Sequence, residues 1–332
     1  MLLSTGWSVV KEGPLPHLAN GAHPLLLRCP RCFGSLGYLP GSTIECSGCG
    51  FVLACEQGVW KALLPVRAAR YERFIRDYES IRAAEGRGSI SDDYYLALPY
   101  RDLSGKLSSQ WAVRARTFRY IEDKLLPRIT TLTEPRLRVL DLGAGNGWLS
   151  YRLANQGHVP VAVDLLTNDQ DGLGASRHYQ RRLGVLFPRF QAELDNLPFA
   201  DSQFDVAIFN ASFHYSENYE KTFAEALRCV REGGTVMIAD SPWYPDEQSG
   251  LAMLEERRAL FIKRYGFPSD ELKSREYLTD ERLKEIERWF RVRFQIHEPY
   301  YGLRWHMRPL VARLRRARKP SRFRIYTAKV AK

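Results

Sequence analysis

The stretch that decides the fold is VLDLGAGNGW, residues 139–148, near the middle of the 332-residue chain. An apolar run ends at Asp141, and Gly143, Gly145 and Gly147 follow at alternate positions. A strand that leads through such a turn into a helix N-terminus offers backbone N–H groups and room for a ligand at the sheet edge. The pattern therefore predicts a nucleotide site.

Strand-like and helical patterns alternate around this loop. The runs RLRVLDLG, HVPVAVDLL, FDVAIFNA and GGTVMIAD have the composition of strands that are buried on both faces. Helical segments separate them, and two more strand candidates, RVRFQIHE and FRIYTAKV, come near the end. This order predicts an α/β fold with a doubly wound sheet.

Trp148 narrows the choice of nucleotide. The dinucleotide pattern G-x-G-x-x-G/A needs a small residue where this chain has an indole. A bulky side chain there obstructs the helix–strand packing and the pyrophosphate approach of NAD sites. The sequence therefore disfavours NAD.

The loop resembles the first motif of the class I S-adenosylmethionine-dependent methyltransferases, with a core of the methyltransferase type 11, ubiquinone-biosynthesis-like kind. That motif has an acidic residue two places before G-x-G-x-G, which Asp141, Gly143, Gly145 and Gly147 match. The resemblance implies a Rossmann-like, seven-stranded doubly wound sheet and S-adenosyl-L-methionine as cofactor. It also implies that the glycine backbone lies against the methionine part of the cofactor and that the acidic residue organises that end.

Further matches follow in the family's order between residues 136 and 243. Asp164 ends the second strand, where the family's carboxylate accepts hydrogen bonds from both ribose hydroxyls. Glu193 and Leu194 lie in the stretch that resembles the adenine motif, with Glu193 where Asp is more common. Asn210 lies in the fourth-strand stretch. By resemblance, these four residues join Asp141 and the three glycines in binding the cofactor.

Four of the six cysteines form two C-x-x-C pairs, Cys29 with Cys32 and Cys46 with Cys49. This spacing suits four thiolate ligands around one Zn²⁺ ion. Four thiolates leave no open coordination position, so we expect structural zinc. The ribbon resembles that of small tRNA methyltransferase activators, also fused to many methyltransferases, more than that of rRNA guanine methyltransferases, whose last ligand is commonly His. It does not by itself imply RNA.

The acceptor side is less well specified. The stretch NASFHYS after the fourth strand lacks the [N/D]-P-P-[Y/F] signature that grips exocyclic amino groups of bases. His214 and Tyr215 lie where the family places acceptor-side residues, and they are the catalytic candidates. A base is needed only where the acceptor is protonated at the working pH. Packing in the pocket wall is the alternative role for His214.

The chain divides into four regions by composition: a zinc ribbon (1–65), a helical linker or lid (66–130), a cofactor-binding core (131–245), and the C-terminal part of the core with a basic segment (246–332). The second region holds four candidate lid contacts, Tyr94, Tyr95, Tyr100 and Arg101, for which ordinary packing is the alternative role.

The net charge of +11 is concentrated in one segment, because no Asp or Glu follows Glu298. For residues 302–324, contact with RNA, with an anionic membrane or lipid-linked substrate, and a solvated arm all remain open. The absence of a long apolar run or a leader-like start predicts a cytoplasmic protein.

The first function that the sequence predicts is methyl transfer from S-adenosylmethionine to a small-molecule or biosynthetic-intermediate acceptor. The alternatives are an rRNA or tRNA base methyltransferase that uses the ribbon and the basic segment, and a non-catalytic cofactor-binding or scaffold protein. Oligomeric state is not predicted.

Overall fold

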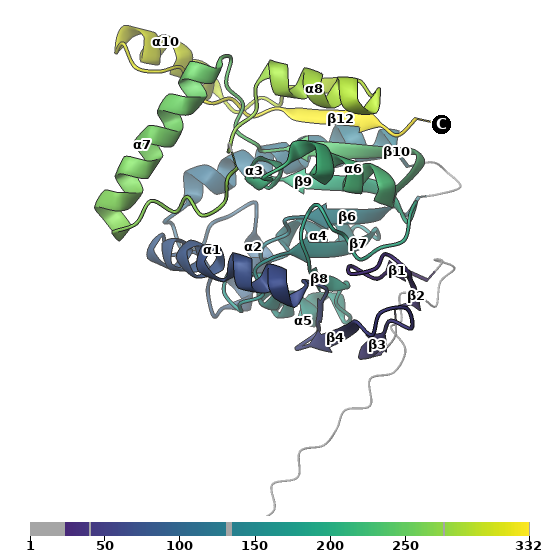
Figure 1. Cartoon of the computed structure of the whole chain (residues 1–332). Helices are drawn as coiled ribbons and strands as arrows, with labels where there is room; N and C mark the ends of the chain where they lie inside the picture. Colours follow the sequence, from purple (N-terminus) through teal and green to yellow (C-terminus); the bar gives the residue numbers. More distant parts are fainter. Residues whose placement is uncertain (1–23, 40, 131–134, 275, 332) are drawn as a thin grey trace, which may run out of the picture.

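The computed structural model describes residues 24–39, 41–130, 135–274 and 276–331, and Figure 1 shows a central sheet with helices on both faces. The order of the large sheet is β11-β12-β10-β9-β6-β7-β8-β5-β4-β3. Its strands are β3 (Thr43–Glu45), β4 (Val52–Glu56), β5 (Val59–Lys61), β6 (Arg138–Leu142), β7 (Val159–Asp164), β8 (Arg189–Gln191), β9 (Phe204–Asn210), β10 (Val230–Ala239), β11 (Phe294–His297) and β12 (Ile325–Lys329).

The seven strands from β11 to β8 form the doubly wound sheet, which confirms the predicted fold class. β6 lies between β7 and β9, and all the pairings from β8 through β10 are parallel. β12 runs antiparallel to both β10 and β11. Parallel strands send their carboxyl ends to one edge, so the loops after β6, β7, β9 and β10 meet there.

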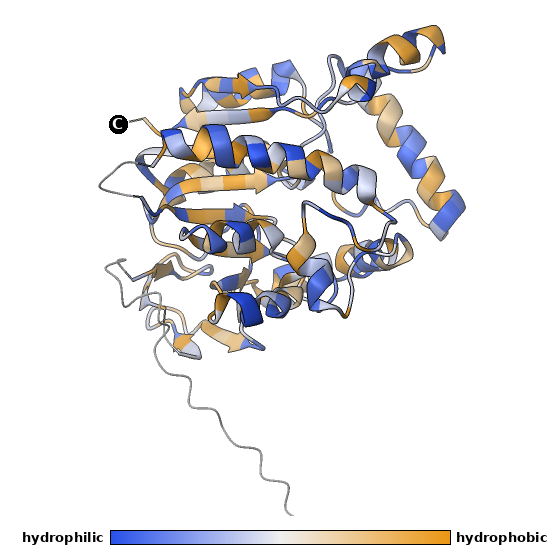
Figure 2. Cartoon of the chain, turned by 180° about the vertical axis from the view of Figure 1, so that it is seen from behind, coloured by the Kyte–Doolittle hydropathy of each residue, from blue (hydrophilic) through white to orange (hydrophobic). Residues whose placement is uncertain are grey.

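Alternating side chains of β6 belong to two different hydrophobic layers, one on each face of the sheet. Leu140 and Leu142 belong to the layer that includes α6 and α8, and Val139 belongs to the layer of α2, α3 and α4. Figure 2 shows the apolar strands of this sheet enclosed between the helices. The helices of the two layers are α2 (Asp92–Ala97), α3 (Ser108–Tyr120), α4 (Trp148–Asn155), α6 (Tyr219–Cys229) and α8 (Asp280–Phe290).

The indole of Trp148 packs between α4 and α3. It is 4% exposed, and its ring meets Trp111 edge-on at 6.0 Å and Phe118 at 5.6 Å. The residue that replaces the third glycine of a dinucleotide motif therefore fixes α3 beside the glycine loop.

The N-terminal ribbon joins the same sheet. Its first hairpin, β1 (Leu26–Arg28) with β2 (Ser35–Tyr38), is separate, but β3, β4 and β5 extend the large sheet. β5 pairs in parallel with β8, Trp60 opposite Phe190. Within the described residues, the sheet thus has ten strands, three more than the predicted core, and the ribbon forms its outer edge. Residues 1–23 of the predicted ribbon region lie outside the described residues.

The remaining helices frame the carboxyl edge or project beyond it. α1 (Pro65–Ala84) crosses in front of the edge, and α7 (Glu247–Tyr265) and α10 (Arg308–Leu314) stand away from the sheet in Figure 1. Among the described residues, no helix has the length and apolar character to cross a bilayer. The shorter helices are 121–125 (π), 126–128, 173–179 and 213–215 (all 3-10), α5 (Gln180–Leu183) and α9 (Leu303–His306).

Candidate functional site

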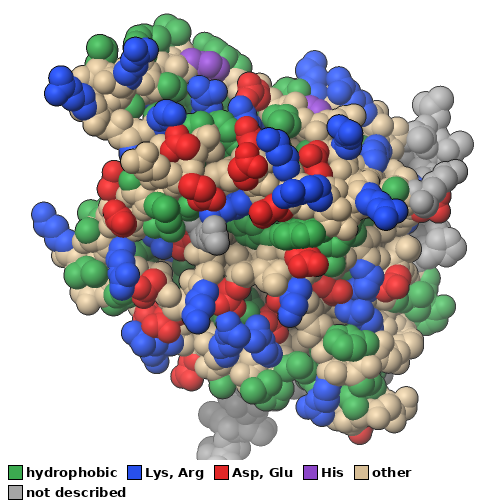
Figure 3. Space-filling view, turned by 45° about the horizontal axis from the view of Figure 1, so that its top comes forward, with side chains coloured by type: hydrophobic (Ala, Val, Ile, Leu, Met, Phe, Trp, Pro, Cys, Tyr) green, Lys and Arg blue, Asp and Glu red, His purple; other side chains and the backbone are tan. Residues whose placement is uncertain are grey.

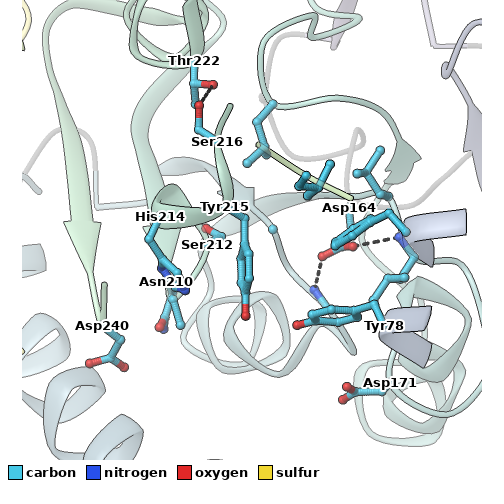
Figure 4. Close-up of a pocket in the computed structure, with 18 of the residues that line it drawn as sticks. Tyr78, Asp164, Asp171, Asn210, Ser212, His214, Tyr215, Ser216, Thr222 and Asp240 are labelled. Atoms are coloured by element: carbon cyan, nitrogen blue, oxygen red, sulfur yellow. Dashed lines mark hydrogen bonds between the residues drawn. The ribbon is translucent and has the colours of Figure 1, made fainter. Parts of the chain in front are cut away.

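A cavity of about 330 Å³ lies at the carboxyl edge of the sheet (Figure 4). It is bounded by the loops after β6, β7, β8, β9 and β10, and α1 and α3 complete the wall. Eight of the ten residues predicted to bind cofactor or act in catalysis line it: Gly143, Gly145, Asp164, Glu193, Leu194, Asn210, His214 and Tyr215.

The glycine loop is shaped by left-handed backbone conformations. Gly143 has φ +76°, and a Cβ there would lie 2.2 Å from the Cβ of Ser212. Gly145 has φ +54°, and its N–H donates to Oδ2 of Asp164 across 2.7 Å. The loop can therefore follow β6 closely and still present its backbone to the cavity.

Asp141 and Gly147 support the loop from behind and do not line the cavity. The buried carboxylate of Asp141 accepts from the backbone N–H and the hydroxyl of Ser150, in the first turn of α4. Burial raises the pKa of Asp141 to about 7. Gly147 is the N-cap residue of α4, with φ +77°. These positions indicate that Asp141 and Gly147 fix the shape of the glycine loop.

Asp164 is held by backbone groups at the end of β7. Its Oδ1 accepts from the N–H of Leu166 across 2.8 Å, in addition to the bond from Gly145 to Oδ2. Burial raises the pKa of this carboxyl group, and the two backbone N–H groups oppose that effect. These contacts fix the direction of the carboxylate in the cavity wall.

Glu193 has partners on α1. Its Oε1 accepts from Nε of Arg67 across 2.7 Å and from the hydroxyl of Tyr71 across 2.9 Å. The side chain of Glu193 is 6% exposed. The residue predicted to lie beside adenine therefore also attaches α1 to the sheet edge.

Two polar side chains in the cavity wall have atoms without a hydrogen-bond partner among the described residues. They are both amide atoms of Asn210, at the end of β9, and Oδ2 of Asp240, after β10. Asn210 is 7% exposed and Asp240 is 5% exposed. Oδ1 of Asp240 accepts from the hydroxyl of Thr117 on α3. Buried polar atoms without partners are rare in folded proteins, so both side chains are candidates for binding a ligand.

His214 and Tyr215 lie in the same wall. In Figure 4, His214 is next to Asn210, and Tyr215 lies between them and Asp164. Nδ1 of His214 is 3.2 Å from the hydroxyl of Ser241. Burial, followed by the charges of Arg114 and Arg257, lowers the pKa of His214 to about 3. The imidazole is therefore neutral at physiological pH.

Sequence reasoning did not identify the contribution of α1 to the cavity. Tyr71, Phe74, Tyr78 and Arg82 line it from one face of that helix. Their spacing of three and four residues is the available signal, but it does not say which part of the protein the face meets. Arg82 forms a buried salt bridge with Asp171, which also lines the cavity.

The four candidate lid residues lie elsewhere. Tyr94 and Tyr95 are buried in the hydrophobic layer with α3 and α4, and the ring of Tyr95 stacks on His178 at 4.3 Å. Tyr100 packs against the guanidinium groups of Arg119 and Arg152. Neither these three tyrosines nor Arg101 is among the described residues that line the cavity. Packing is the role that the structure gives the tyrosines.

The four predicted zinc ligands converge at the ribbon. The Sγ atoms of Cys29 and Cys49 are 3.6 Å apart, those of Cys32 and Cys46 are 3.5 Å apart, and all four lie within 4.8 Å of one another. Four thiolates at 2.3 Å from a tetrahedral ion would be about 3.8 Å apart. The cluster therefore has nearly the size that a Zn²⁺ ion requires. Cys229 is buried, and Cys55 is partly buried.

Comparison with known proteins finds similarity over the part of the chain that carries the glycine loop and the strands around it. A family model described as a methyltransferase domain matches residues 140–238. A ubiquinone/menaquinone biosynthesis C-methyltransferase of Rhizobium etli is 22% identical over 167 residues, 49% of this chain and 62% of the relative.

Two further proteins extend the comparison. A malonyl-[acyl-carrier protein] O-methyltransferase of Geobacter sulfurreducens is 30% identical over 165 residues, 49% of this chain and 53% of the relative. The chain thus spans less than two thirds of the length of both curated relatives. The solved structure of 1,6-didemethyltoxoflavin-N1-methyltransferase of Burkholderia thailandensis, with that compound and S-adenosylhomocysteine bound, covers 88% of this chain and 100% of its own, with TM-score 0.47 and 16% identity.

Proposed function

We propose, from the premise that this chain belongs to the class I S-adenosylmethionine-dependent methyltransferases, that it methylates a small molecule bound beside Asn210 and His214. The observation that carries the proposal is the buried amide of Asn210. It faces a cavity shared with the glycine loop and has no partner among the described residues.

The cavity wall suits the cofactor. S-adenosylmethionine, when bound, supplies an electrophilic methyl group on a sulfonium. Gly143 and Gly145 would face its methionine part, Asp164 its ribose, and Glu193 with Leu194 its adenine. A carboxylate fixed by two backbone N–H groups is well suited to accept bonds from vicinal hydroxyls, because little conformational freedom is lost on binding.

Asn210 and Asp240 are the groups available to an acceptor. The amide of Asn210 offers both a donor and an acceptor, and Oδ2 of Asp240 offers an acceptor. For a hydroxyl or ammonium acceptor, Oδ2 would take the proton that the acceptor atom must give up to be methylated. Burial raises the pKa of Asp240, which improves it as a base.

His214 is better suited to orienting the acceptor than to deprotonating it. An imidazole with a pKa of about 3 holds a proton too weakly to act as the base at neutral pH. As a neutral ring it remains available for a hydrogen bond. The ring of Tyr215 lies 4.3 Å from that of His214 and meets the ring of Tyr78 edge to face at 5.9 Å, so the two tyrosines give the cavity an apolar wall beside His214.

The four-cysteine cluster completes the proposal. We propose that Cys29, Cys32, Cys46 and Cys49 bind one Zn²⁺ ion, supported by their mutual Sγ distances. Zinc in this position would stabilise the ribbon, whose strand β5 pairs with β8.

Transfer of labelled methyl groups tests the function. Purified protein and labelled S-adenosylmethionine are incubated with a metabolite extract and, separately, with total RNA. We expect label in the small-molecule fraction, and at least tenfold less with Asn210→Ala or Asp240→Asn. Asp201→Asn, at a largely exposed carboxylate, is the matched control.

Two other outcomes would contradict the proposal. Label in RNA alone would identify a base methyltransferase. Binding of S-adenosylmethionine without transfer to either fraction would identify a cofactor-binding protein that does not catalyse. Binding is measured by titration calorimetry in both cases.

A further inference from the structure

The arm formed by residues 302–324 carries an exposed apolar stripe. Its members are Leu303, Met307, Leu310, Val311 and Leu314, and they are 40% to 77% exposed. The helix continues from α9 into α10 through backbone hydrogen bonds. The N–H of Met307 donates to the carbonyl of Leu303, and the N–H of Val311 donates to the carbonyl of Met307. At α-helical spacing the five side chains fall within an arc of about 100°. They therefore form one continuous face.

The opposite face of the arm attaches it to the protein. Trp305 stacks on Phe323 at 5.4 Å, and Arg308 lies over the Trp305 ring at 4.0 Å. Arg318 forms a salt bridge with Glu256 of α7. The arm is thus held in a definite orientation, and the stripe faces away from these contacts.

Basic side chains flank the stripe on both sides. On the same helical spacing, Arg304 and Arg315 lie beyond one border and Arg313 beyond the other. All three are exposed, and none has an ion pair among the described residues. From Tyr300 to Lys332 the sequence has no acidic residue. Figure 3 shows hydrophobic and basic side chains together on the projecting lobe at upper left.

We propose that this face of residues 303–314 docks on an anionic lipid surface. An apolar stripe between rows of basic side chains is the arrangement of a helix in the plane of a membrane interface. The aliphatic side chains enter the acyl boundary, and the arginines reach the phosphate headgroups. The inference concerns where the protein resides and holds for any acceptor.

The charge and the side-chain types of the stripe and its flanks decide which kind of partner it can bind. A nucleic-acid surface would use the arginines, but it would leave five aliphatic side chains against polar phosphates. A second copy of the same face would bring like charges together, because the arm has no acidic residue to oppose its arginines. An anionic bilayer satisfies both the apolar and the basic groups.

The arm also adjoins the cavity. Phe323, on which Trp305 stacks, is one of the residues that line it. Docking through the stripe would therefore hold the cavity within a few side chains of the lipid surface.

Flotation with vesicles tests the docking. The protein of residues 1–332 is mixed with vesicles of phosphatidylcholine and phosphatidylserine, or of phosphatidylcholine alone. We expect binding to the anionic vesicles that weakens in high salt. Leu310→Ser with Leu314→Ser should reduce partitioning on the order of tenfold. Replacement of Arg304, Arg313 and Arg315 by Gln should reduce it on the order of a hundredfold.

The matched control is Val66→Ser with Ile90→Ser, two exposed aliphatic side chains outside the arm, which should bind vesicles as the wild type does. Failure of the wild type to float with anionic vesicles would overturn the proposal. The proposal would also be overturned if the protein bound RNA through the three arginines and the two leucine changes altered neither vesicle binding nor RNA binding. A wild-type dimer that the leucine changes convert to a monomer would show instead that the stripe joins two copies.

Discussion

Arg67 of α1 and Glu193 after β8 form a salt bridge in which Nε donates to Oε1 across 2.7 Å. The hydroxyl of Tyr71, one turn further along α1, donates to the same oxygen. This contact joins a helix that follows the ribbon to the edge of the cofactor cavity. Its loss should affect stability and the cavity together.

Removal of the positive charge of Arg67 should destabilise the protein. Arg67→Met leaves the buried Glu193 carboxylate without its charged partner, which should lower the free energy of unfolding by about 1–3 kcal/mol. Urea denaturation measures the change. Arg76→Met, at an exposed arginine of the same helix with no ion pair among the described residues, is the control. Equal stability of the two variants would show that the bridge contributes nothing.

Asp164 should matter for cofactor affinity. Asp164→Ala removes two backbone contacts and the carboxylate proposed to bind the ribose, so S-adenosylmethionine should bind about 30- to 150-fold more weakly, or 2–3 kcal/mol. Titration calorimetry checks this, with Asp169→Ala in the following loop as the control because its side chain is 51% exposed. Unchanged affinity of a folded Asp164→Ala protein would exclude Asp164 from the site.

Metal content should depend on the clustered cysteines alone. Cys32→Ser should reduce bound zinc from about one ion per chain to near zero, and it should lower the thermal midpoint by about 5 °C or more. Cys55→Ser, outside the four-cysteine cluster, should retain the metal. Elemental analysis of protein purified without chelator measures both. Absence of zinc from the wild type would refute the zinc site.

The buried imidazole should make stability depend on pH. In the folded protein the pKa of His214 is about 3, against an ordinary value of 6.5, so below pH 6.5 the unfolded chain binds a proton that the folded protein does not. The free energy of unfolding therefore falls as the pH decreases, by about 2 kcal/mol between neutral pH and pH 5 from this group.

His214→Asn should remove that part of the pH dependence. Urea denaturation at neutral pH and at pH 5, for the wild type and the variant, gives the comparison. Other titrating groups cancel in the difference between the two proteins. A variant that loses as much stability as the wild type would show that His214 is not buried as a neutral group.

The core of the fold could be predicted because its signals are local. The run that ends at Asp141 and the glycines after it specify a strand, a turn and a helix within about ten residues. The C-x-x-C pairs likewise carry their geometry in their spacing.

The cavity wall formed by α1 could not be predicted in this way. Periodicity predicted that helix, but the direction of Tyr71 and Tyr78 depends on contacts with distant residues such as Glu193 and Tyr215. The same holds for Asp240, whose partner Thr117 is on α3. Such groups become recognisable as site residues only when the chain is folded.

Pairing of β5 with β8 has a consequence for the order in which the protein is assembled. Trp60 lies opposite Phe190, so the strand that β5 needs is synthesised 130 residues later. All four cysteines precede β5, and the two hairpins of the ribbon close over short distances in the chain. During synthesis, a metal-loaded ribbon can therefore form before β8 is made. Until β8 is made, the side of β5 that pairs with it is open to other strands.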